Sequence, residues 1–237
     1  LDIVDVDGAV NFAADVTFAD GADIITASAG TSNFRAGVNA GNSIASGGTN
    51  NVFVGDEAGT ANTTADHNTA LGYGTLSSDT LGQANVAIGS QALATQNFTS
   101  STDSYNTAVG RKAGYAVTTG VKNTLIGGLV GDSITTANNN TAVGYNSLTA
   151  NTTGAANVAL GSIASFKNTT ASNNTAIGYG ALYDNTTGAN NVAVGYLTLE
   201  NNTTASNNTA VGTDSLKANT TGTENTAVGM RCADANT

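Results

Sequence analysis

Branched aliphatic residues recur along this chain inside one short pattern: Asn, then Thr or Val, then usually Ala, then Val, Ile or Leu, then Gly. The pattern occurs eleven times, and nine of the ten intervals between copies are 17 residues. Such self-similarity predicts a repeat architecture in which each copy forms one structural unit. The copies begin at Asn51, Asn68, Asn85, Asn106, Asn123, Asn140, Asn157, Asn174, Asn191, Asn208 and Asn225, and a degenerate copy begins at Asn33.

Numbering each unit from its Asn predicts the path of the chain. Positions 2 to 4 place β-branched residues on either side of a small one, which is typical of a short strand. Gly at position 5 ends this strand, and the Asn and Thr residues near positions 12 to 14 favour a turn. We expect residues 2 and 4 to face the core, together with Leu at position 9, and Ala at position 3 to point to the opposite side.

These elements predict an all-β fold, a parallel β-roll or β-solenoid of 17-residue coils. Seventeen residues return the chain to an equivalent place one strand spacing further on, so that identical residues stack and the Asn residues at position 1 form an amide ladder. A helical repeat is excluded because each unit carries Gly and Asn and most units carry paired Thr. We assign residues 33–237 to the repeat region, with regular coils from 51, and residues 1–32 to an N-terminal β lead-in or capping segment.

Each predicted coil buries about three good apolar side chains, which is a thin core for 17 ordered residues. The column of small residues at position 3 allows another sheet to approach closely. Association of identical chains along the fibre axis supplies such a sheet and shields the sheet edges.

Composition and charge exclude several functions. Of the 237 residues, 10% are charged and the net charge is -10, so the chain is expected to be a poor binder of nucleic acid, which needs a basic patch. No apolar run reaches the length of a membrane helix, so membrane insertion is not expected. The single cysteine excludes a framework of disulfides within the chain, and no motif calls for a cofactor.

The unit Asn174-Thr175-Ala176-Ile177-Gly178 and its siblings resemble the head repeat of trimeric autotransporter adhesins, whose core is Asn-Ser-Val-Ala-Ile-Gly. Longer-period versions of this repeat occur in phage tail-fibre shafts and in giant surface proteins with an endosialidase-type chaperone. The resemblance covers residues 51 to 229 and implies a homotrimer, a left-handed parallel β-roll and a role in attachment. This chain departs from the adhesin heads in its longer unit and in one four-residue insertion.

Five aromatic residues are candidates for a binding surface. Four tyrosines share position 6, where an outward row could stack on sugars; alternatively, they cover the edge of the core. The insertion, within 95–105, is either a binding loop anchored by an aromatic side chain or a tolerated bulge. The candidates are Tyr73, Tyr145, Tyr179, Tyr196 and Phe98.

No residues are assigned to catalysis or to a metal. His67, the only histidine, follows Asp66 in a predicted turn, where simple exposure is favoured over a Ser-His-Asp hydrolase site. Asp56 and Glu57 match no calcium loop and indicate a solvated acidic face. We therefore expect a protein that is not an enzyme.

The sequence favours a structural fibre segment of a surface appendage, in particular a phage tail fibre used in host attachment. The expected location is extracellular, in the virion tail fibre or, alternatively, on the bacterial cell surface. The expected partners are further copies of the chain and a cell-surface glycan or protein receptor. One alternative is a bacterial trimeric adhesin head that binds a receptor or matrix. Another is an ice-binding β-solenoid, although only one Thr of each adjacent pair can face outward.

Overall fold

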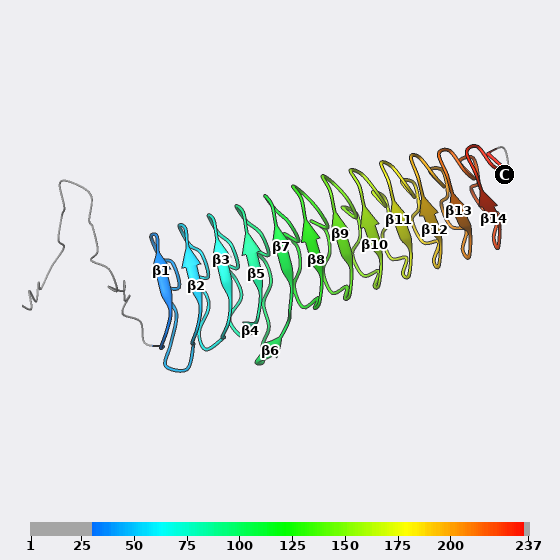
Figure 1. Ribbon diagram of the computed structural model, residues 1–237. Helices are drawn as coiled ribbons and strands as arrows, with labels where there is room; N and C mark the ends of the chain where they lie inside the picture. The colour runs from blue at the N-terminus through cyan, green and yellow to red at the C-terminus, as the bar shows by residue number, and fades with distance from the viewer. Residues whose placement is uncertain (1–29, 235–237) are drawn as a thin grey trace, which may run out of the picture.

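A computed structural model describes residues 30–234, which form a stack of coils with a short strand on each (Figure 1). Twelve strands make one parallel sheet, and β4 and β6 make a second, two-stranded sheet. No helix occurs between residues 30 and 234. The strands are β1 (Phe34–Ala36), β2 (Val52–Val54), β3 (Thr69–Leu71), β4 (Gly82–Gln83), β5 (Val86–Ile88), β6 (Thr102–Asp103), β7 (Thr107–Val109), β8 (Thr124–Ile126), β9 (Thr141–Val143), β10 (Val158–Leu160), β11 (Thr175–Ile177), β12 (Val192–Val194), β13 (Thr209–Val211) and β14 (Thr226–Val228).

Each strand of the large sheet pairs with the equivalent strand of the next coil. Thus Val158 pairs with Thr175 and Ala159 with Ala176, 17 residues further along the chain. The degenerate unit that begins at Asn33 supplies β1, which pairs in parallel with β2. The predicted parallel β-solenoid of 17-residue coils is therefore confirmed.

The prediction of which strand face lies in the core is wrong. Position 3 is buried in every coil from β2 to β14, whereas positions 2 and 4 are half-buried or exposed. The interior of a 17-residue coil is narrow, and Leu at position 9 and Asn at positions 1 and 12 already fill most of it. In most coils the space left opposite them holds only the methyl group of Ala.

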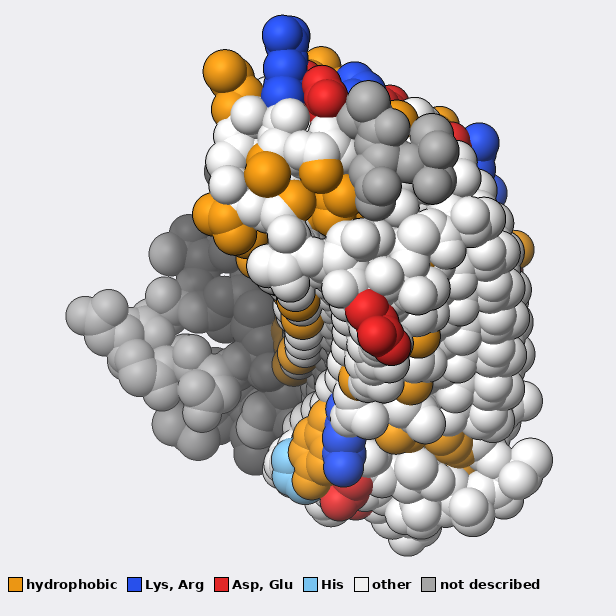
Figure 2. All heavy atoms as spheres, turned by 90° about the vertical axis from the view of Figure 1, so that its right-hand side faces the viewer, with side chains coloured by type: hydrophobic (Ala, Val, Ile, Leu, Met, Phe, Trp, Pro, Cys, Tyr) orange, Lys and Arg blue, Asp and Glu red, His pale blue; other side chains and the backbone are white. Residues whose placement is uncertain are grey.

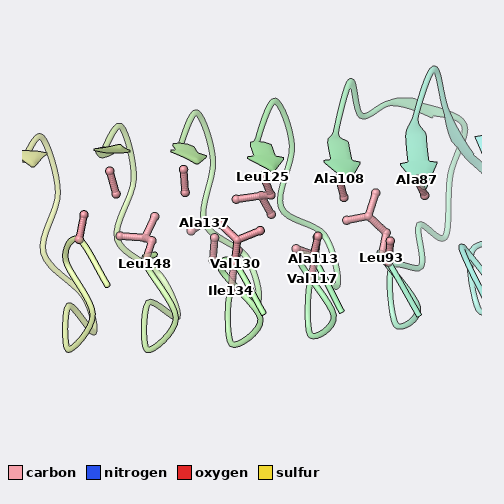
Figure 3. Close-up of a cluster of buried hydrophobic side chains, with 14 of the residues drawn as sticks. Ala87, Leu93, Ala108, Ala113, Val117, Leu125, Val130, Ile134, Ala137 and Leu148 are labelled. Carbon is pink, nitrogen blue, oxygen red and sulfur yellow. The ribbon is translucent and has the colours of Figure 1, made fainter. Parts of the chain in front are cut away.

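Side-chain volumes inside the coils compensate for one another. Phe53 occupies position 3 in a coil that has Gly59 at position 9, and a Cβ atom at Gly59 would lie 2.6 Å from the ring. Leu125 likewise faces Gly131, where a Cβ atom would lie 3.0 Å from its Cδ2. Figure 3 shows Leu93, Leu125 and Leu148 directed into the interior from opposite walls. In these two coils a large residue at position 3 thus occupies the space that Leu at position 9 fills in many others.

Two ladders of buried asparagines link the coils. At position 1, the side-chain oxygen Oδ1 of Asn140 accepts from the backbone N–H of Asn157 at 2.9 Å and from its Nδ2 at 3.2 Å. This is the predicted ladder. A second ladder, which the sequence analysis did not predict, joins the amides at position 12 of successive coils, namely Asn151, Asn168, Asn185, Asn202 and Asn219. Both ladders satisfy polar groups that the narrow core buries.

In an earlier coil, position 12 is occupied by Asp79, which is separated from the second ladder by Gln96, Val117 and Ile134 at the same position. Its carboxylate is buried and accepts from Gln96 Nε2 at 2.6 Å and from the Gly82 N–H at 3.0 Å. Burial raises the pKa of the Asp79 carboxyl above its ordinary value, against the opposing effect of these hydrogen bonds. In the preceding coil, the side-chain oxygen of Asn62 is buried without a hydrogen-bond partner.

Glycine at position 5 is required by close approach between coils. Gly144 has a φ of 134°, and a Cβ atom there would lie 2.5 Å from the carbonyl oxygen of Gly161 in the next coil. Any side chain would therefore push two coils apart, which explains why this glycine recurs in every unit.

The 21-residue coil lays its insertion along the side of the solenoid, where β6 pairs with β4 of the coil before it. Phe98 is 6% exposed, so the prediction that it is a surface anchor is wrong. Its ring lies next to Gly82, and the carbonyl of Phe98 accepts from Thr80 Oγ1 at 2.9 Å. The insertion brings its own apolar residue and buries it against the preceding coil.

Candidate functional site

The outer face of the long sheet carries a continuous apolar column. Position 4 of each coil presents a branched aliphatic side chain outward, and Val143 and Ile177 are 36% and 37% exposed. Figure 2 shows hydrophobic side chains in a column that runs along a hollow on one side of the molecule. Members of this column with large exposed surfaces are Leu71, Ile126, Val143, Ile177 and Val228. An apolar face of this length is typical of a protein contact surface.

The four tyrosines of position 6 are exposed, and two of them lie together. Tyr179 and Tyr196 belong to adjacent coils, and their rings stack with centroids 5.6 Å apart and planes 14° apart. Tyr145 lies two coils before Tyr179, with Ser162 at position 6 of the coil between them. Tyr73 is isolated, because three coils with other residues at position 6 separate it from Tyr145. The structure therefore brings three of the five candidate residues into one stretch.

A second aromatic pair, which the sequence analysis did not single out, lies at position 10. Phe166 and Tyr183 stack with centroids 5.2 Å apart, and Lys167 Nζ lies 5.3 Å from the centre of the Tyr183 ring. Lys167 also pairs with Asp184 at 2.7 Å, and this hydrogen bond is the main cause of its raised pKa. Aromatic residues at one position of adjacent units are the signal that could have identified this pair.

The structure assembles neither a hydrolase site around His67 nor a metal site around Asp56 and Glu57. His67 is exposed at position 17, while the carboxylate of Asp66 accepts from the backbone N–H and hydroxyl of Thr49. Within residues 30–234, no group of three or more His, Cys, Asp or Glu side chains is placed to hold a metal ion. In the same range, no helix has the length and apolar character needed to cross a membrane.

The paired threonines have different roles, as the alternation of an extended segment requires. Thr169 directs its hydroxyl to the carbonyl of Thr186 in the next coil at 3.0 Å, whereas Thr170 is exposed. The first threonine of the pair therefore stabilises coil stacking, and only the second threonine of each pair faces outward. The pairs thus present one outward threonine column rather than two, which weakens the ice-binding alternative.

Comparisons with protein-family models, with curated proteins and with solved structures find no match to this chain. Its functional interpretation therefore depends on its own geometry.

Proposed function

We propose that this chain is a structural segment of a fibrous surface appendage, in particular a phage tail fibre that serves in host attachment. The observation that carries the proposal is the long parallel solenoid with an unpartnered apolar column on its sheet face. The twelve stacked strands of the large sheet extend over roughly 50 Å. Hydrogen bonds between the coils make such a stack stiff, and a stiff rod holds a binding end at a distance.

The apolar column supports association of three copies into a homotrimer. Position 4 is aliphatic on every coil from β2 to β14, yet in a single chain these side chains stay half in water. Packing this face against another copy removes a continuous surface from solvent and gains about 25 cal/mol per Å² of apolar area. The proposed contact therefore involves the aliphatic residues of position 4 rather than the Ala column of position 3, which is buried inside the coils.

The test is the solution mass of the 237-residue chain, measured by light scattering after gel filtration. We expect a mass near three times 23.3 kDa. Replacing two exposed column residues, as in Val143→Asp with Ile177→Asp, should yield a folded species near 23.3 kDa, because neither side chain lies in the coil interior. The control is Thr153→Asp with Thr170→Asp, which adds the same charges at exposed position 14 of two coils.

A wild-type mass near 23.3 kDa would overturn the trimeric fibre. Loss of trimers in the threonine control as well as in the column variant would show that added charge, rather than the apolar column, controls association.

A further inference from the structure

The row of position-6 side chains has a gap whose size matches one ring. Adjacent coils of a parallel stack are about 4.8 Å apart, so side chains of Tyr145 and Tyr179, two coils apart, are separated by roughly 10 Å. The stacked pair of Tyr179 and Tyr196 shows that rings in this row lie face to face along the solenoid. Two coil spacings of about 4.8 Å leave room for one ring between the positions of Tyr145 and Tyr179, because stacked rings lie roughly 5 Å apart.

No aromatic residue of the chain itself stands at position 6 between the two tyrosines. Ser162, the residue of the intervening coil, has a side chain too short to stack with either ring. A Cβ atom at Gly128, on the other side of Tyr145, would lie 3.7 Å from Cδ2 of its ring, so this ring does not fill the space above Ser162. Both tyrosines are accessible, with exposed fractions of 58% for Tyr145 and 49% for Tyr179.

The surroundings of the gap indicate a neutral, hydroxyl-bearing occupant. Positions 6 and 7 of the four coils from Asn140 to Asn207 carry no charged residue. Ser162 at position 6 and Asn146 at position 7 of adjacent coils carry side chains that can hydrogen-bond. A pyranose ring presents C–H groups on its faces, which suit the negative face of a tyrosine ring, and hydroxyl groups at its edge.

We propose that Tyr145 and Tyr179 bracket a slot above Ser162 that binds one neutral pyranose ring of a cell-surface glycan. This proposal deepens the attachment role proposed above and rests on it. The slot lies beyond the glycine at position 5, so it is distinct from the aliphatic column of position 4.

The experiment measures saturation-transfer NMR from the full chain to two neutral hexasaccharides, maltohexaose and chitohexaose, with polysialic acid as an anionic comparison. We expect transfer to ring C–H protons of a neutral sugar and about tenfold weaker binding for Tyr145→Ala. Ser162→Tyr should abolish binding, because a tyrosine there fills the slot. Thr213→Tyr is the matched control, since it adds a ring at position 6 beyond Tyr196 and should leave binding unchanged.

The solution mass of each variant separates this proposal from the fibre proposal. If the wild type is trimeric but shows no transfer to either neutral sugar, the proposed glycan slot is wrong and the fibre proposal is unaffected. Equal binding by Ser162→Tyr and the wild type also overturns it. If Ser162→Tyr loses the trimeric mass while Thr213→Tyr keeps it, the row belongs to the contact between chains, and the slot is not a glycan site.

Discussion

The residue at position 17 of each coil adopts a left-handed backbone conformation. Asn173 and Asn190 have φ values of 60° and 59°, and most L-residues avoid this region because Cβ approaches the following carbonyl. Asparagine tolerates it better than other non-glycine residues, which accounts for its frequency at this position. Ala156 has the same backbone conformation, with a φ of 57°, although alanine tolerates it less well than asparagine does.

Replacing Ala156 with Asn should stabilise the protein. The backbone conformation is unchanged while its strain falls, so we expect a gain of about 0.5–1 kcal/mol in the free energy of unfolding. Urea denaturation followed by circular dichroism measures this gain. Ala155→Asn, at a neighbouring position without positive φ, is the control and should change stability little. Equal gains from both variants would contradict the backbone explanation.

At the scale of the coil, the asparagine ladder predicts the effect of replacing Asp79. In Asp79→Asn, the new Nδ2 could donate to the unpartnered Oδ1 of Asn62, as Asn168 donates to Asn151 in a later coil. The new Oδ1 keeps the bond from the Gly82 N–H, whereas Gln96 Nε2 now donates to the other carboxylate oxygen and must turn to share Oδ1. The Oδ1 of Asn151 is shared in this way by Gly154 and Asn168. We expect about 1–2 kcal/mol of added stability at pH 7, since a buried polar atom gains a partner and a buried charge is removed.

The raised pKa of Asp79 also sets a pH dependence. Protonated Asp79 contributes its full stability below the ordinary pKa of 3.8, and that contribution is lost as the pH rises through the raised pKa of the folded state. Urea denaturation at a series of pH values should show a loss of stability across this window in the wild type, reduced in Asp79→Asn. Asp56→Asn, which removes an exposed carboxylate, serves as the control. A pH profile in Asp79→Asn that matches the wild type would contradict the assignment.

The exchange of side-chain volume between positions 3 and 9 predicts that a paired substitution at these two positions compensates for the loss caused by each single one. Phe53→Ala should cost about 3–5 kcal/mol, and Gly59→Leu alone should destabilise by overpacking against the ring. The double variant recreates the Ala and Leu arrangement of other coils, with Asn62 already at position 12, and should recover more than half of the summed loss. Denaturation of all four proteins gives the coupling energy. If the losses of stability in the two single variants simply add in the double variant, the side chains of positions 3 and 9 do not share one space.

The same pairs show what the sequence could and could not predict about the fold. Alternation at period two predicts that positions 2 and 4 share a face, but β-branched residues suit either face of a strand. Only the cross-section of the coil decides which face is inside. The pairing of Phe53 with Gly59, and of Leu125 with Gly131, was the available signal, because a large residue appears at position 3 only in coils whose position 9 is glycine.

The candidate surface was partly predictable for a related reason. A shared position in a regular repeat places Tyr145, Tyr179 and Tyr196 in one row, so their spacing follows from the period. Phe98 lies in the insertion, where the period no longer applies. Its burial depends on the path of the loop over the preceding coil, and nothing in the repeat pattern specifies that path.

At the scale of the whole molecule, each coil contacts mainly its neighbours, so stability is expected to be a sum over coils and coil interfaces. Removing residues 157–173 deletes one complete coil and joins Ala156 to Asn174, which preserves every column of the repeat. The asparagines of position 12, Asn151 and Asn185, then become neighbours, as do Tyr145 and Tyr179. The slot above Ser162 disappears with the coil.

We expect this deletion variant to fold, to keep the oligomeric state of the wild type and to shorten the rod by about 4.8 Å. Circular dichroism, light scattering and small-angle X-ray scattering measure these three properties. Binding of neutral hexasaccharides should be lost, because Tyr145 and Tyr179 now stack on each other. Deleting only residues 157–169 is the control, since it removes 13 residues and shifts every later column out of register, so it should unfold the region that follows. If both deletions unfold the chain to the same extent, the coils are not independent units, and the stacking of equivalent positions does not determine stability.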